Sequence, residues 1–458
     1  MLGVGWQGLV RLLTTFLIGR LAGPAVLGVV SAANAVAQIT TLLYGAGAGS
    51  AASKYLAAAR GREDQGEMHG VAALLRQRVL WVSTMLAAGA AGYWYLTEGS
   101  AVSAVTVALL AAGLTGWNFV RGVLFGAGQV RRATTLDVVT GALGLIGVLA
   151  VLILGLRSPV VLVPVALGYL LFAAMSWPRA LSPSPLVELG REVGGFVVLA
   201  SVGTLGSAGF LQASLLAARA VAGDAAAGHY SAAMALATPM SIMAAGLGVV
   251  LFPSLARAWG AGDVPGFRRQ TDIATRVLIT ALIPVTAIVV ILRHPIVALV
   301  WGEGFEETAS FLPFLLTAIL VTGMSAPSVS AITTVSQRGM RISATVSVTG
   351  AALGILVWLL GSSLGIRIVP VGYLVGVALI AVVPIVLVWR RDRHAWGLLW
   401  GRVVLMIAVV AAALPWTSAA PLAWLLPASI VVVAAWGAMS LTDIRAAARV
   451  LRRQRQPG

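Results

Sequence analysis

Five basic side chains stand inside or at the ends of long apolar runs of this 458-residue chain: Arg11, Arg20, Lys54, Arg219 and Arg257. Arg11 lies in the middle of the first run, where an unpaired charge is costly to bury. A guanidinium binds a carboxylate or phosphate through two parallel hydrogen bonds, so these residues predict a site for an anion. The alternative for Arg11, Arg20 and Arg219 is a long side chain that extends to a polar interface. For Lys54 and Arg257 the alternative is the ordinary excess of basic residues on one side of a membrane.

Four neutral polar residues also fall within apolar runs: Asn34, Gln38, Asn118 and Gln212. Their amides can donate hydrogen bonds to the hydroxyl groups of a sugar and accept hydrogen bonds from them. The alternative is that they join neighbouring helices by hydrogen bonds, which is an equally common role for such side chains. The predicted substrate-binding residues are therefore five cations and four amides.

Carboxylates are expected only in or near loops. The chain has 15 acidic residues, and each of them, including Asp137, lies close to the end of an apolar run. A cavity with arginine and little carboxylate favours an anionic ligand, of which a polyprenyl diphosphate is one. The sequence contains no phosphate-binding loop, no pair of histidines at helical spacing and no nucleophile elbow. We therefore expect no catalytic residue, no metal and no cofactor.

Membrane-spanning helices must position these residues. Hydrophobic residues make up 59% of the chain and charged residues 10%, whereas a soluble protein has about 25% charged residues. Runs of about 20 apolar residues without strict alternation predict an all-α polytopic membrane protein rather than a membrane barrel. Fourteen runs are found, near 3–20, 26–52, 72–96, 101–120, 135–156, 159–177, 195–218, 226–256, 273–300, 308–335, 342–364, 369–389, 397–416 and 420–440.

The distribution of the basic residues predicts the orientation in the membrane. Of the 31 Lys and Arg residues, 25 fall in the tail or in the loops that follow even-numbered runs, and five fall in the opposite loops. Because cytoplasmic loops carry the excess of positive charge, both termini are expected in the cytoplasm. The net charge of +16 does not indicate a nucleic-acid partner, because the charges are spread over short loops instead of one basic face.

An internal repeat predicts the domain organisation. Five residues recur with an offset of 200 positions, since Gly23, Gly28, Ser31, Ala32 and Ala33 return as Gly223, Gly228, Ser231, Ala232 and Ala233. Six helices separate the copies, and this even number predicts two lobes of the same orientation, related by an axis along the membrane normal. The expected domains are a six-helix lobe at 1–180, a second at 190–391, an extra helix pair at 392–441 and a basic cytoplasmic tail at 442–458.

Two local patterns carry a resemblance to a known superfamily. The first is Arg20-Leu21-Ala22-Gly23-Pro24 with Leu27-Gly28, and the second is Trp301-Gly302-Glu303-Gly304-Phe305. Both resemble polysaccharide flippases of the multidrug/oligosaccharidyl-lipid/polysaccharide exporter (MOP) superfamily, which includes O-antigen and lipid II flippases. The resemblance implies fourteen helices, with two lobes forming a V around a cavity that opens alternately to either side.

The resemblance also implies a function and a location. The expected substrate is a polyprenyl-diphosphate-linked oligosaccharide or peptidoglycan precursor, moved from the inner to the outer leaflet of a bacterial plasma membrane. The expected partners are this lipid-linked glycan, membrane lipid and glycan-assembly enzymes. The alternative is an exporter of a small molecule or secondary metabolite, because the same fold also serves such exporters.

Overall fold

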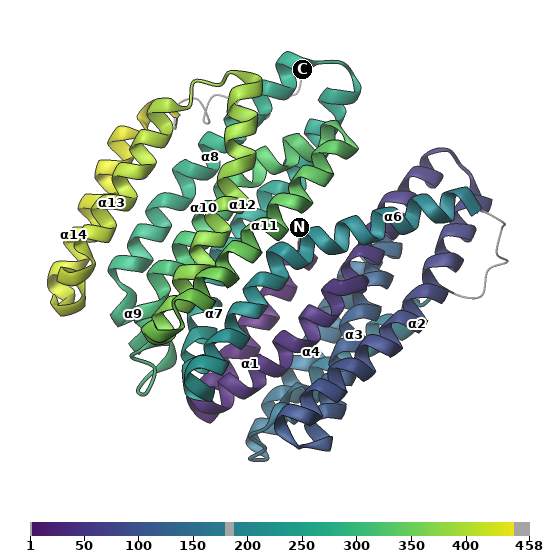
Figure 1. Cartoon of the computed structure of the whole chain (residues 1–458), viewed down its shortest axis with the longest axis horizontal. Helices are drawn as coiled ribbons and strands as arrows, with labels where there is room; N and C mark the ends of the chain where they lie inside the picture. Colours follow the sequence, from purple (N-terminus) through teal and green to yellow (C-terminus); the bar gives the residue numbers. More distant parts are fainter. Residues whose placement is uncertain (1, 179–186, 444–458) are drawn as a thin grey trace. The chain divides into compact units, whose positions relative to one another are not determined.

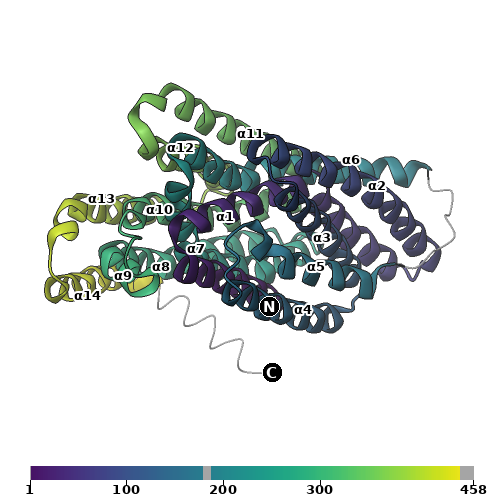
Figure 2. The ribbon, with the colours of Figure 1, turned by 90° about the horizontal axis from the view of Figure 1, so that it is seen from below.

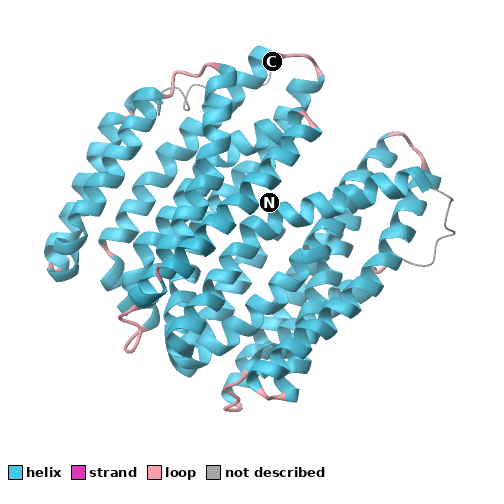
Figure 3. Cartoon of the chain, in the orientation of Figure 1, coloured by secondary structure: helices cyan, strands magenta, loops and turns pink. Residues whose placement is uncertain are grey.

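The computed structural model describes residues 2–178 and 187–443, and throughout these ranges the chain forms helices and short loops without a strand (Figure 3). The helices are α1 (Leu2–Gly61), α2 (Gln65–Glu98), α3 (Ala101–Gly126), α4 (Val130–Ile153), α5 (Val163–Ser176), α6 (Val187–Thr204), α7 (Phe210–Gly260), α8 (Val264–Ile291), α9 (Arg293–Trp301), α10 (Thr308–Val335), α11 (Gln337–Leu360), α12 (Ile368–Asp392), α13 (Gly397–Ala419) and α14 (Leu422–Met439). Two 3₁₀ segments, η1 (Pro159–Leu162) and η3 (Ser362–Arg367), and one π-helical segment, η2 (Leu205–Gly209), connect some of them. The predicted all-α membrane class is confirmed.

Twelve helical runs within the described ranges are long and apolar enough to cross a membrane. Two of them are 57 and 56 residues long, and each contains one glycine with non-helical backbone angles, Gly23 and Gly223. An unbroken helix of that length would extend about 85 Å, nearly three times the hydrocarbon core. These two glycines therefore break runs that are too long for one span. The predicted number of fourteen spans counts each broken run twice and stays a prediction.

The chain forms two compact units. Unit 1 contains Met1–Ala235 and Leu360–Val369, and unit 2 contains Leu236–Leu359 and Pro370–Gly458. The lobes predicted at 1–180 and 190–391, and the helix pair at 392–441, stay predictions. Most of the predicted tail at 442–458 lies outside the described residues, as does the end of the first predicted lobe.

In unit 1, α1 packs along α3 through small residues (Figures 1 and 2). A Cβ atom added to Gly49 would overlap the carbonyl of Asn118, and one added to Gly122 would overlap the carbonyl of Gly49. Small residues let two helix backbones approach closely where lipid offers no hydrophobic drive to association. The glycines of the apolar runs thus hold α1 directly against α3.

The two glycine breaks bring equivalent residues of the repeat into contact within unit 1. Gly28 lies against the carbonyl of Asp224, and Gly228 lies against the carbonyl of Pro24. Between these contacts, the hydroxyl oxygens of Ser31 and Ser231 are 2.7 Å apart and share a hydrogen bond. The contacts are reciprocal with respect to the repeat. Gly28 of the first copy meets position 224 of the second, and Gly228 of the second copy meets position 24 of the first.

In unit 2, polar contacts of Arg276 in α8 and of Arg293, the first residue of α9, hold α13 and the segment that follows α14. Arg276 forms ion pairs with Asp272, at 3.0 Å, and with Asp443, at 2.7 Å. Arg293, with only 5% of its surface exposed, donates to Thr417 Oγ1 at 2.6 Å and to the carbonyl oxygen of Leu414 at 3.0 Å. Helix α13 and the segment that follows α14 are therefore fastened to the body of unit 2.

Candidate functional site

Arg11 and Arg20 both lie on α1 with exposed side chains. Neither guanidinium forms a hydrogen bond or an ion pair with any residue that the structure describes, although the backbone oxygen of Arg11 accepts a bond of 2.9 Å from Thr15 Oγ1. Both cations are therefore available to a ligand. Arg11 also lies half-way along the first part of α1, as the sequence predicts.

Arg219, on α7, is already paired. Its guanidinium lies 2.7 Å from Glu98 and 2.6 Å from Asp224, and it covers the ring of Trp94 with its carbon Cζ 5.4 Å from the centroid. An anionic ligand would have to displace a carboxylate to reach it. Sequence reasoning treated Arg219 like Arg20, but the structure places them in different electrostatic surroundings.

Lys54, on α1, lies against aromatic rings. Its Nζ atom is 4.4 Å from the ring centroid of Phe196 and 5.0 Å from that of Tyr55. The Tyr55 hydroxyl in turn donates to Glu192 Oε1 at 3.0 Å. A cation over aromatic faces is stabilised without a counter-ion, and Lys54 stays exposed enough to meet a ligand. The side chain of Arg257 lies outside those that the structure describes.

The four amides divide into two groups. Gln212 donates to Gln38 Oε1 at 3.1 Å, which joins α7 to α1 in the way that the interhelical alternative describes. Asn118 donates to the carbonyl of Leu114 in its own helix, at 2.9 Å. Asn34 is half-buried and forms no side-chain hydrogen bond within the described part of the chain. Asn34 is therefore the amide best placed to form a hydrogen bond with a hydroxyl group of a ligand.

Asp137 corrects the expectation that carboxylates occur only in or near loops. It lies two turns inside α4 and is completely buried, at 0% exposure. Its carboxylate accepts hydrogen bonds from Trp117 Nε1 at 2.8 Å, Arg121 Nε at 3.0 Å and Gln7 Nε2 at 3.2 Å. The expectation was wrong because α4 begins at Val130, so that Arg131 and Arg132 belong to its first turn instead of a loop. A helix start placed by hydropathy alone misses such charged first turns.

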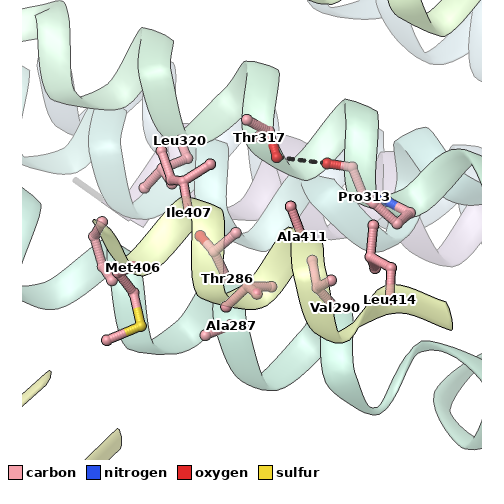
Figure 4. A pocket seen from close by; sticks show the side chains of 12 residues that line it. Thr286, Ala287, Val290, Pro313, Thr317, Leu320, Met406, Ile407, Ala411 and Leu414 are labelled. Atoms are coloured by element: carbon pink, nitrogen blue, oxygen red, sulfur yellow. Dashed lines mark hydrogen bonds between the residues drawn. The ribbon is translucent and has the colours of Figure 1, made fainter. Parts of the chain in front are cut away.

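Unit 2 contains an apolar crevice between α8, α10 and α13 (Figure 4). Its walls are almost entirely hydrocarbon. The lining residues are Ile283, Thr286, Ala287, Val290, Pro313, Thr317, Leu320, Met406, Ile407, Val410, Ala411 and Leu414. The hydroxyl of Thr317 is turned to the carbonyl of Pro313 in its own helix, at 2.6 Å, and Thr286 likewise bonds to Leu282 at 2.8 Å. With its polar groups satisfied internally, the crevice suits a hydrocarbon chain.

Comparisons with solved structures define the class. The chain superposes on an inward-facing multidrug resistance MATE family transporter of the MOP superfamily with a TM-score of 0.69, at 16% identity over 84% of this chain and 94% of that one. A MOP superfamily transporter from Pyrococcus furiosus, described by the reverse polarity of its binding pocket, gives a TM-score of 0.64 at 18% identity, over 86% and 93% of the two chains. At such identities the likeness establishes the fold alone: the chain has the fold of these multi-pass MOP transporters.

The sequence then places the chain within that class. Residues 163–442 match the family described as Lipid II flippase MurJ, which is more than half of the chain. The chain therefore belongs to the lipid II flippase family MurJ, and its function is that of a flippase for a lipid-linked precursor. No curated protein matches it. The predicted superfamily and flippase function are confirmed.

Proposed function

We propose that this protein moves lipid II, or a closely related polyprenyl-diphosphate-linked precursor, from the inner to the outer leaflet, with Arg11 binding the diphosphate. The observation that carries the proposal is the exposed and unpaired guanidinium of Arg11 in the apolar first half of α1. An unpaired intramembrane charge is a functional residue by default, and a guanidinium matches the geometry of a phosphate. Membership of the lipid II flippase family supplies the substrate class.

Other cations and amides extend the proposed site. Arg20 lies on the same helix as Arg11 and is equally free, and Asn34 follows on the second half of α1. We assign Arg20 to the diphosphate and Asn34 to the glycan. Lys54 and Arg257 are assigned to the cytoplasmic entry path of the anion. The pairing of Arg219, Gln38 and Gln212 favours a structural role for these three.

The apolar crevice of unit 2 is the proposed site for the polyprenyl tail. It is lined by α13, one of the two helices beyond the internal repeat, and its hydrocarbon walls match the chemistry of the tail. Burial of a hydrocarbon chain in such a crevice costs no polar group its hydrogen bond. The contacts of Arg276 and Arg293 support a fixed position of α13, which forms one wall of the crevice, within unit 2.

The proposal includes the arrangement in the cell. We propose that the protein lies in the bacterial plasma membrane with fourteen spans, two parallel lobes and both termini in the cytoplasm, and that access to the substrate alternates between the two sides. The excess of basic residues on one side supports this orientation. Glycan-assembly enzymes, which make the substrate on that side, are the proposed partners.

The test replaces Arg11. Arg11→Ala should abolish transport of lipid II in reconstituted vesicles, and Arg11→Lys should restore it only in part, because an ammonium is a point charge that cannot form the two-pronged contact. The measurement is the appearance of lipid II in the outer leaflet at equal protein level. Arg62→Ala, at an exposed arginine paired with Glu67, is the matched control and should transport normally.

Two outcomes would contradict the proposal. Full activity of Arg11→Lys would mean that the side chain only extends to the interface, since lysine reaches it as well. Export of a small organic cation by a wild-type protein that does not flip lipid II would favour the exporter function.

A further inference from the structure

Within unit 1, the first turns of α1 pack against α4 through three side chains. One of them forms a hydrogen bond and the other two make van der Waals contacts. Gln7 Nε2 donates to Asp137 Oδ1 at 3.2 Å and lies 3.4 Å from the backbone oxygen of the same residue. One turn along α4, Trp6 and Val10 cover Gly141, where an added Cβ would lie 2.9 Å from Trp6 Nε1 and 3.2 Å from Val10 Cγ2. These contacts fix how α1 is rotated about its own axis.

The anchor on α4 is itself rigid. Asp137 is completely buried, and Trp117 and Arg121 of α3 hold its carboxylate from the other side at 2.8 and 3.0 Å. The ring of Trp117 also packs against Tyr169 of α5, with the centroids 5.5 Å apart. The carboxylate of Asp137 thus joins α1 to a framework of three other helices.

Arg11 follows Gln7 by four residues, so the two side chains leave α1 about 40° apart and one turn above each other. A helix is about 10–12 Å wide with its side chains, so a rotation of 30° moves an atom at its edge by about 3 Å. That displacement exceeds the tolerance of a hydrogen bond. The direction of the Arg11 guanidinium therefore depends on the hydrogen bond between Gln7 and Asp137.

We infer that Gln7 and Asp137 are positioning residues: they fix the rotation of α1 and so aim the Arg11 guanidinium at the substrate diphosphate. The inference rests on the proposed function in one respect, the role of Arg11 as the diphosphate-binding residue. Neither Gln7 nor Asp137 needs to touch the substrate.

The first experiment measures the position of residue 11 without transport. The chain has no cysteine, so Arg11→Cys carries a single thiol, and its rate of reaction with a water-soluble methanethiosulfonate reports its exposure. Adding Gln7→Leu should change this rate several-fold. The control is Gln129→Leu, the same replacement at an exposed glutamine whose side-chain oxygen accepts a hydrogen bond from Arg132. An equal rate with and without Gln7→Leu would overturn the inference.

The second experiment separates positioning from general stability. Gln7→Leu should raise the KM for lipid II about tenfold with a smaller change in kcat, because misalignment weakens a charge-assisted hydrogen bond by at least that factor. In the Arg11→Lys background the rise should shrink to about twofold, since an ammonium has no planar fork to align. The same rise in both backgrounds would show that Gln7 acts independently of Arg11.

The two experiments also separate this inference from the proposed function. If the wild-type protein does not transport lipid II, the proposed function fails, while the labelling rate of the Arg11→Cys variant still decides whether Gln7 sets the position of residue 11. If transport is normal and the labelling rate is unchanged, only the positioning role fails.

Discussion

The ion pair between Arg121 and Asp137 gives a prediction about stability. Asp137 has no exposed surface, and the Arg121 side chain is 18% exposed, so either residue left alone would be a nearly buried charge without its partner. Removing one member of a buried pair typically costs about 3–5 kcal/mol, whereas replacing both by apolar residues costs far less. Arg121→Leu and Asp137→Leu should each lower the free energy of unfolding by about that amount.

The double replacement should be less harmful than either single one. It removes both charges and leaves the donors of Trp117 and Gln7 without the carboxylate oxygen that accepts from them, at about 1 kcal/mol or slightly more each. The loss expected for the double variant is therefore about 2–3 kcal/mol, well below the sum of the two single losses. Such non-additivity is the signature of direct coupling.

The measurement is unfolding by sodium dodecyl sulfate in mixed micelles, followed by tryptophan fluorescence for the wild type, both single variants and the double variant. The exposed pair Arg62–Glu67 provides a parallel cycle, in which the unfolding midpoint should hardly move. Additive losses for Arg121 and Asp137 would refute the reasoning, because they would mean that neither residue compensates the charge of the other.

Two further predictions concern the backbone and the orientation. Gly223→Ala should destabilise the protein by about 1–3 kcal/mol in the same unfolding assay, because φ of +82° with ψ of −172° is accessible almost only to glycine. Gly195→Ala, at an open helical position, is the control. Equal unfolding midpoints for the wild type and Gly223→Ala would contradict the strained conformation. For the orientation, a thiol reagent that cannot cross the membrane should label Glu303→Cys in whole cells but not Gly61→Cys, both exposed positions in the cysteine-free chain. Labelling of the Gly61→Cys variant from outside would reverse the proposed topology.

The class and the positions of the helix breaks could be predicted from sequence because they depend on local properties. Long apolar runs specify helices in a membrane, and the repeated Gly23 and Gly223 are the positions where the backbone leaves the helix. The resemblance carried by the loop patterns led to the correct superfamily for the same reason, since those patterns are contiguous in the chain.

The electrostatics of the site could not be predicted, because they depend on partners that are distant in sequence. Arg219 meets Glu98 across 121 positions, and Gln7 meets Asp137 across 130. A hydropathy profile treats Arg219, Glu98, Gln7 and Asp137 alike, as residues near the ends of apolar segments. Only the packing of α1, α3 and α4 shows that Asp137 is buried. Arg11 and Arg20 stay predicted anion-binding residues, and among the described residues no side chain distant in sequence pairs with either guanidinium.

The reciprocal contacts of Gly28 and Gly228 make the two helix breaks a single junction. Two copies of one surface that meet across a two-fold axis make every contact twice, and a residue on the axis meets its own equivalent. Gly28 with Asp224, Gly228 with Pro24, and Ser31 with Ser231 satisfy both conditions. A side chain added at Gly28 or at Gly228 would therefore meet the backbone of the other copy at the same junction, and either change would push apart the two helix breaks.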